Sequence, residues 1–164
     1  MQKVLNIYLF MLALLIGLEF SAGAFVAPVI FNPSEIIGDG ILTHFQSGQL
    51  MTEVFLRFNN FLIIISIISF VYESVNFAKN RLESFNRKFS TFMLSLLNLF
   101  LALVFVFYFT DYIVEAQHLG TTQTQAFSDI HNASEWTMKV ILFSQTFLFF
   151  LRFPKINKAE ASKK

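Results

Sequence analysis

Three charged side chains lie within or at the edges of long apolar stretches of this sequence: Glu19, Arg57 and Lys139. An ionised group inside a bilayer is costly unless it is paired or hydrated, so such residues are functional candidates. Counting the helical rise per residue places Glu19 and Lys139 at similar depths, with Arg57 nearer the surface. An ion pair between Glu19 and Lys139, with Arg57 as the alternative partner, is the less favoured of two interpretations. The other interpretation is a protonated or hydrated Glu19 beside a Lys139 that extends toward the surface.

Uncharged polar side chains form a second candidate set, nearer the middle of the same stretches. Ser66, Asn98 and Gln145 fall at similar depths when the helical rise is counted from one membrane boundary. Such groups commonly join transmembrane helices through hydrogen bonds worth on the order of 1 kcal/mol each. This structural role is the favoured interpretation, and a polar permeation path is the alternative.

The three histidines are the residues that could bind a transition metal such as copper. His44, His118 and His131 lie outside the apolar stretches, and no pair has the H-x-x-x-H spacing of ligands on one helix, so they are weak candidates. Four further side chains could complete such a site: Met51, Met138, Glu53 and Asp129. Haem is disfavoured because no histidine lies inside an apolar stretch.

No catalytic motif accompanies these residues. The sequence has no Walker loop, no G-x-S-x-G and no H-E-x-x-H, and it has no cysteine to act as nucleophile or ligand. No spacing argument assembles a Ser, His and Asp set. We therefore expect a non-enzymatic protein without a cofactor.

The elements that must position these side chains are predicted from composition. The 164 residues are 55% hydrophobic and 14% charged, and they include 23 Phe. Soluble domains have about 45–50% apolar and about 25% charged residues. The composition excludes a disordered chain, a disulfide scaffold and a nucleic-acid-binding domain with a large basic field.

A single transmembrane domain is expected over residues 1–153, followed by a basic tail over 154–164. Four apolar stretches are predicted to cross a bilayer core of about 30 Å. They cover residues 4–31, 54–78, 89–113 and 136–153.

The cations are distributed unevenly along the chain. Ten of the twelve Lys and Arg residues would lie on one side of a four-span protein: at the N-terminus, in the link between spans two and three, and in the tail. Acidic side chains prevail in the other connections. The positive-inside rule then places both termini in the cytoplasm, and we expect a multi-pass protein of a bacterial inner membrane.

The first span has a second interpretation. Lys3, the apolar run and the sequence Ala22-Gly23-Ala24 resemble a signal peptide with its cleavage site. Glu19 interrupts the run before that site and apolar residues continue after it, so an uncleaved span is the preferred prediction.

Small side chains line two faces of the first span. One face carries Ala13, Gly17, Ser21, Ala24 and Pro28, and the other carries Glu19, Gly23 and Ala27. Because small residues let helices approach closely, we expect packing on both sides, within the bundle or against a second copy or another membrane protein. The lipid bilayer is the remaining partner, and no nucleic acid is expected.

The connections are predicted to differ in structure. Residues 32–53 carry apolar side chains near helical spacing, with Ser34 or Asn32 as a possible helix cap. This pattern predicts an amphipathic helix on the outer face that leads into the second span. Residues 121–133 are rich in Thr, Gln and Asn, which favours an exposed loop.

Two stretches carry a resemblance to a known family. GLEFSAGAFVAPVIF closes the first span and ends in Ala27-Pro28-Val29-Ile30-Phe31, and DGILTHFQSGQLMTEVFLRFN leads into the second span. They resemble a family of uncharacterised bacterial four-helix membrane proteins, a domain of unknown function with eukaryotic transmembrane relatives. The resemblance covers the first half of the chain by motif and the second half by hydropathy. It implies a four-helix integral membrane fold and no established activity.

The sequence thus predicts an all-α polytopic membrane protein built as a bundle of four transmembrane helices. We expect a non-enzymatic accessory or stress-related membrane component that acts through packing. One alternative is a small transporter of ions or small molecules that uses Glu19, and another is a copper-binding protein of the outer face.

Overall fold

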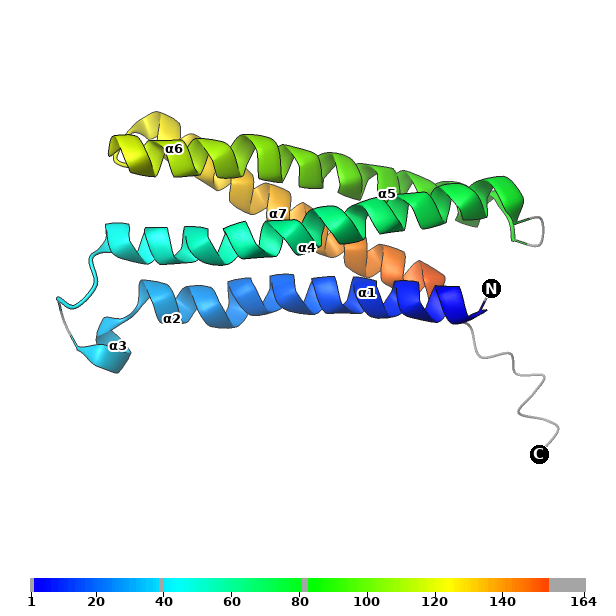
Figure 1. Ribbon diagram of the computed structural model, residues 1–164, viewed down its shortest axis with the longest axis horizontal. Helices are drawn as coiled ribbons and strands as arrows, with labels where there is room; N and C mark the ends of the chain where they lie inside the picture. Colours follow the sequence, from blue (N-terminus) through cyan, green and yellow to red (C-terminus); the bar gives the residue numbers. More distant parts are fainter. Residues whose placement is uncertain (1, 39, 81–82, 154–164) are drawn as a thin grey trace.

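The computed structural model describes residues 2–38, 40–80 and 83–153, and in it four long helical segments lie side by side (Figure 1). The first segment comprises α1 (Gln2–Ser21), the π-helix η1 (Ala22–Val26) and α2 (Ala27–Phe31), and the short α3 (Ser34–Ile37) follows it. The second is α4 (His44–Lys79). The third comprises α5 (Phe85–Val104), the π-helix η2 (Phe105–Thr110) and α6 (Asp111–Leu119), and the fourth is α7 (Gln125–Arg152). Within the described residues there is no β-strand.

The bundle has two distinct ends. The termini end holds the start of α1, the connection between α4 and α5, and the end of α7 (Figure 1). The loop end holds α3 and the connection between α6 and α7 (Figure 1). The predicted basic tail, residues 154–164, lies outside the described residues.

Three of the four segments are long and apolar enough to cross a membrane. They cover Lys3–Phe31, His44–Lys79 and Phe85–Leu119, which are 29, 36 and 35 residues long. At about 1.5 Å per residue, each exceeds the thickness of a bilayer core of about 30 Å. The predicted all-α membrane bundle is confirmed.

The helices bury one stripe of residues each and expose apolar side chains elsewhere. On α7, buried Ile141, Gln145 and Arg152 lie on the inner face, whereas Phe143 and Phe147 on the outer face are 74% and 58% exposed. A bundle in water would reverse this arrangement, because exposed large apolar side chains are unfavourable there. The same inner-polar, outer-apolar pattern on all four segments suits a lipid surround.

The buried stripe recurs at every third or fourth residue, as in helices that pack nearly in parallel. In α1 and η1 it comprises Tyr8, Leu12, Leu15, Glu19 and Ala22, in α4 it includes Asn59, Leu62, Ser66, Ser69 and Glu73, and in α5 it comprises Thr91, Ser95, Asn98 and Ala102. In α7 it runs through Ser134, Met138, Ile141, Gln145, Leu148 and Arg152. The fourth segment therefore packs as a full member of the bundle.

The apolar core is divided into two clusters. The loop-end core comprises Leu15, Phe58, Leu62, Ile65, Ala102, Phe105, Phe109, Met138 and Ile141. The termini-end core comprises Tyr8, Leu12 and Leu148. Along α4, α5 and α7, the polar residues Ser66, Asn98 and Gln145 fall between positions of the two clusters.

Two predicted connections differ from the structure. The amphipathic stretch before the second span is the first part of α4 itself, because Thr43 starts that helix with a capping box to Gln46; Asn32 and Ser34 do not cap it. The loop predicted over residues 121–133 is shorter, since Thr124 accepts a hydrogen bond from the Phe127 amide and α7 begins at Gln125. Polar composition masked a well-capped helix start in both places.

Candidate functional site

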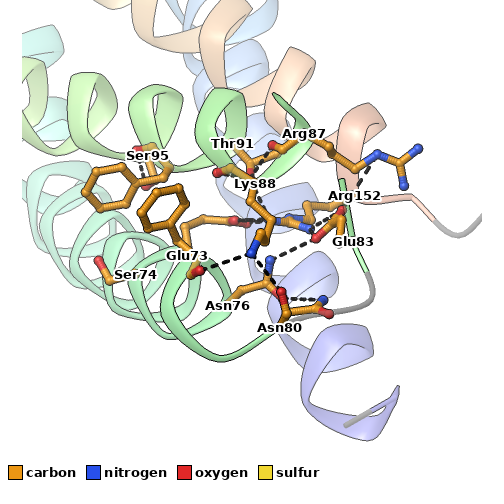
Figure 2. A network of polar contacts seen from close by, with 12 residues as sticks. Glu73, Ser74, Asn76, Asn80, Glu83, Arg87, Lys88, Thr91, Ser95 and Arg152 are labelled. Carbon is orange, nitrogen blue, oxygen red and sulfur yellow. Dashed lines mark hydrogen bonds and ion pairs between the residues drawn. The ribbon is translucent and has the colours of Figure 1, made fainter. Parts of the chain in front are cut away.

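A buried ionic network lies at the termini end of the bundle (Figure 2). Arg152 Nε on α7 donates to Glu73 Oε1 of α4 at 2.8 Å, and its Nη2 also bonds Glu73 Oε2. Arg152 Nη1 donates to both oxygens of Glu83, at 2.8 and 2.7 Å, and Nη2 reaches Thr91 Oγ1 on α5. Glu73 is fully buried. Through these hydrogen bonds, the guanidinium of Arg152 connects α7 to α4, to α5 and to the link between them.

Neighbouring side chains complete this network. Asn76 Nδ2 donates to Glu83 at 2.9 Å, and Arg87 lies 3.6 Å from the same carboxylate. Although partial burial alone would raise the pKa of Glu83, the hydrogen bonds from Asn76 and Arg152 and the nearby cations lower it below its usual value. Lys88 Nζ donates to the backbone oxygen of Asn80 at 2.8 Å and so supports the end of α4 (Figure 2).

The chemistry of this network is that of a structural clamp. All four carboxylate oxygens of Glu73 and Glu83 accept a hydrogen bond, and the guanidinium donates from all three nitrogens. Such a saturated, buried arrangement offers no free group to a ligand. The network fixes the rotation and axial position of α7 against α4 and α5.

Sequence reasoning missed this network. Glu73 and Arg152 lie near the ends of the second and fourth predicted spans, where charged side chains usually reach water, so neither is among the candidates above. A signal was present in the spacing: Glu73 lies seven residues after Ser66, and Arg152 lies seven after Gln145. Seven residues complete two helical turns, so each charge shares the buried face of its polar predecessor.

A cavity of about 510 Å³ lies in the loop-end half of the bundle. All four helical segments contribute to its wall, which is largely apolar. Five phenylalanines line it: Phe31, Phe45, Phe55, Phe105 and Phe127. Gly23 and Ala27 also face it, and the small side chains of this α1–α2 face leave the space open.

Glu19 is a buried carboxylate in the wall of this cavity. Its exposed fraction is 6%, and neither oxygen has a side-chain partner among the described residues; the backbone of Leu142 on α7 lies nearby. An unpaired ionisable group at this depth is costly to the bundle alone. The Glu19 carboxyl group, and the buried Nδ1 of His131 in the same wall, thus have unused hydrogen-bonding capacity for a ligand.

Glu19 and Lys139 form no ion pair in this structure, which agrees with the interpretation in which Lys139 extends toward the surface. Lys139 Nζ lies 3.5 Å from Glu135 on its own helix and 4.9 Å from the centre of the Trp136 ring. Arg57, the alternative partner, pairs with Glu53 at 3.0 Å on the exposed face of α4. An ion pair between side chains four residues apart on one helix requires less ordering of those side chains than an ion pair across the bundle.

Both π-helical segments border the cavity. η1 begins three residues after Glu19 and supplies Gly23, and η2 supplies Phe105 and Thr110. In η2, Thr110 Oγ1 donates to the Phe105 backbone oxygen at 3.0 Å and accepts from Asn59 Nδ2 at 3.0 Å. Short π-helical turns inside longer helices are frequent at functional sites, because they redirect side chains at a cost in regular hydrogen bonding.

The three histidines are only partly brought together. His44 and His131 both line the cavity, where His44 lies against Phe31 and His131 stacks on Phe127. His118 on α6 is exposed and lines no part of the cavity. In the portion of the chain that the structure describes, no three His, Cys, Asp or Glu side chains are grouped to hold a metal ion.

The central polar residues are buried as expected for groups inside a bundle. Ser66, Asn98 and Gln145 are each at most 2% exposed. Their side-chain oxygens and nitrogens have no hydrogen-bond partner among the described residues, so the interhelical bonds predicted for them are not formed. They mark a polar layer between the two apolar clusters.

Comparison with protein families shows which family the chain belongs to. A family model described as a domain of unknown function, DUF4149, matches residues 10–122, more than half of the sequence. The chain belongs to this family. The resemblance inferred from the motifs around Ala27-Pro28 is confirmed.

The DUF4149 match covers Glu19, Glu73 and Glu83 but ends before α7, so Lys139 and Arg152 lie beyond it. Both the ionic network and the cavity therefore combine residues inside and outside the matched range. No curated protein and no solved structure matches the chain.

Proposed function

We propose that this DUF4149 protein is a non-enzymatic membrane component that binds a small molecule in the cavity beside Glu19. The observation that carries the proposal is a carboxylate, 6% exposed and without a side-chain partner, in the wall of a cavity of about 510 Å³. Ligand pockets of about 300–1,000 Å³ with mostly apolar walls and few polar groups are typical of small-molecule sites.

The proposed membrane arrangement has four spans and cytoplasmic termini in a bacterial inner membrane. Two features support α7 as the fourth span: its outward phenylalanines and its buried polar stripe. The termini end carries Lys3, Lys79, Arg87 and Lys88, which agrees with a cytoplasmic location under the positive-inside rule. The cavity then lies toward the outer leaflet.

Binding is favoured over passage through the bundle. Leu15, Leu62 and Ile141 are fully buried in the loop-end core, between the cavity and the central polar layer. These apolar side chains interrupt any polar route from Glu19 to the termini end. Transport with Glu19 as the coupling group is the second candidate, and it requires this core to open.

The role as an accessory component rests on a further surface. Gly17 on α1 is exposed, and a side chain added there would meet no atom within 4 Å. The predicted packing on both sides of the first span therefore requires a partner outside the described bundle. Copper binding by His44 and His131 is a weaker alternative, since no third ligand joins them in the described part of the chain.

The experiment that tests the proposal compares two glycine variants. An added Cβ at Gly23 or at Gly17 meets nothing within 4 Å, but only Gly23 lines the cavity. Gly23→Leu should fill the cavity without disturbing the helix, and Gly17→Leu is its matched control, because Leu favours a helix over Gly. The two proteins are purified from native membranes in polymer discs, and bound small molecules are identified by mass spectrometry.

We expect a compound in near-stoichiometric amount with the unchanged protein and with Gly17→Leu, and its loss from Gly23→Leu. The same small-molecule content in all three preparations would contradict ligand binding in this cavity.

A further inference from the structure

The Glu19 carboxyl group has no cationic partner in its cavity. Lys139 also lines the cavity, but its Nζ lies beside Glu135 and the Trp136 ring and forms no ion pair with Glu19. His131 Nε2 also lies 3.4 Å from Glu135. Glu135 thus lies beside both Lys139 and His131, and the buried carboxyl group of Glu19 lines the same cavity without a side-chain partner among the described residues.

Several other polar groups in the wall already have partners, whereas the buried Nδ1 of His131 has none among the described residues. Gln117 Nε2 donates to Thr52 Oγ1 at 2.9 Å, and Thr52 Oγ1 donates to the Gly48 backbone oxygen at 2.9 Å. Thr110 is bonded to Asn59 and to the Phe105 backbone. A ligand in this cavity therefore needs a polar or charged group beside Glu19 and few polar groups elsewhere.

The aromatic wall suits a positive charge. Each of the four helical segments contributes a phenylalanine to the cavity wall: Phe31, Phe55, Phe105 and Phe127. The face of an aromatic ring attracts cations, and the attraction grows where water is excluded. An anion would lie beside the Glu19 carboxylate, which disfavours negative charge.

The position of the cavity favours a lipophilic ligand. α1 packs on α7, whereas α2 packs on α4, and α7 leans away from α2 toward α6 as it approaches the loop end (Figure 1). Residues of all four segments line the cavity in this loop-end half, and exposed apolar side chains such as Phe25 and Val29 lie on the first of these segments. A molecule dissolved in the bilayer is concentrated beside the cavity by its apolar surface.

We propose that the ligand of this cavity is a lipophilic organic monocation, with its charge beside Glu19 and its apolar body against the phenylalanines. The inference rests on the proposed binding function and adds the ligand class. Glu19 supplies the missing counter-charge, and the cavity volume sets the size at that of a molecule with a few rings.

The test uses two probes of nearly equal size and opposite charge, tetraphenylphosphonium and tetraphenylborate. The full chain is placed in nanodiscs of zwitterionic phosphatidylcholine, so that lipid charge does not attract either probe. Binding is measured by equilibrium dialysis, with protein-free nanodiscs used to subtract partition into lipid. The variants are Glu19→Gln, Glu19→Asp, Gly23→Leu and Gly17→Leu.

We expect saturable binding of tetraphenylphosphonium at one per chain and no saturable binding of tetraphenylborate. Glu19→Gln should weaken the phosphonium affinity at least about tenfold, and Glu19→Asp, which keeps the charge, should retain part of it. Gly23→Leu should abolish binding, and Gly17→Leu should leave it unchanged. Equal unfolding temperatures of the unchanged protein and Glu19→Gln establish that the loss is not a loss of fold.

Two results would overturn the ligand class. One is tetraphenylborate binding as tight as that of the phosphonium, and the other is an unchanged phosphonium affinity in Glu19→Gln. If either result occurs while Gly23→Leu still abolishes binding, the cavity binds small molecules without selecting a cation and the proposed function stands. If Gly23→Leu has no effect on either probe, their binding lies outside the cavity and the ligand class is overturned; co-purification with the glycine variants tests the function separately.

Discussion

At the scale of single residues, two buried glutamates of this bundle have opposite environments. Glu73 receives hydrogen bonds from Arg152 on another helix, whereas Glu19 has no side-chain partner in the described residues. Removing one member of a buried pair leaves the other charge uncompensated, and this is more costly than losing an exposed pair. Glu73 is therefore expected to determine stability and Glu19 to determine binding.

Glu73→Gln should destabilise the protein by about 3–5 kcal/mol, because it leaves the Arg152 charge only partly compensated by Glu83 inside the bundle. Unfolding is followed in mild detergent by titration with dodecyl sulfate. The matched control is Glu53→Gln on the same helix, whose pair with Arg57 is exposed, and it should leave stability unchanged. Equal stability of the two variants would show that the Arg152 network is not a clamp.

At the scale of elements, hydropathy alone gives only marginal support for α7 as a membrane span. Only 12 residues separate Lys139 from Arg152, too few to span by themselves. In the structure the two cations differ: Lys139 points to Glu135 on the surface, and Arg152 turns into the bundle. The apolar outer face between them remains continuous through Phe143, Phe147 and Phe150.

If α7 crosses the membrane, a cysteine on its outer face should be shielded by lipid. The chain has no cysteine, so Phe147→Cys gives a single thiol. In intact membranes we expect this thiol to react poorly with a water-soluble maleimide. Ser128→Cys, in the exposed first turns of the same helix, should react readily. Similar reaction rates at the two positions would place the outer face of α7 in water.

At the scale of the whole molecule, the bundle buries polar layers between apolar clusters and exposes apolar side chains on its outside. Five layers follow one another along the bundle axis, starting from the termini end. They are the ionic network, an apolar cluster, a polar layer, a second apolar cluster and the Glu19 cavity. In the proposed membrane arrangement, the clamp and the cavity lie toward opposite sides of the bilayer.

The orientation proposed for the bundle is tested by reporter fusions. A fluorescent protein fused after Lys164 should fold and fluoresce, since we expect the C-terminus in the cytoplasm. Alkaline phosphatase inserted after Gly120, in the connection at the loop end, should be active because that enzyme requires the periplasm. Phosphatase activity at the C-terminus together with inactivity at Gly120 would reverse the orientation and place the cavity on the cytoplasmic side.

The sequence by itself determined the class of protein, its three clearest spans and the central polar positions Ser66, Asn98 and Gln145, because hydropathy and periodicity are properties of each helix alone. Only the tertiary structure decided which charges meet. Glu73 and Arg152 are 79 residues apart, and their contact depends on the rotation and axial position of two helices. The same packing leaves Glu19 unpaired, since Lys139 finds Glu135 within one turn of its own helix. A cavity arises from the space between helices, and no single helix specifies that space.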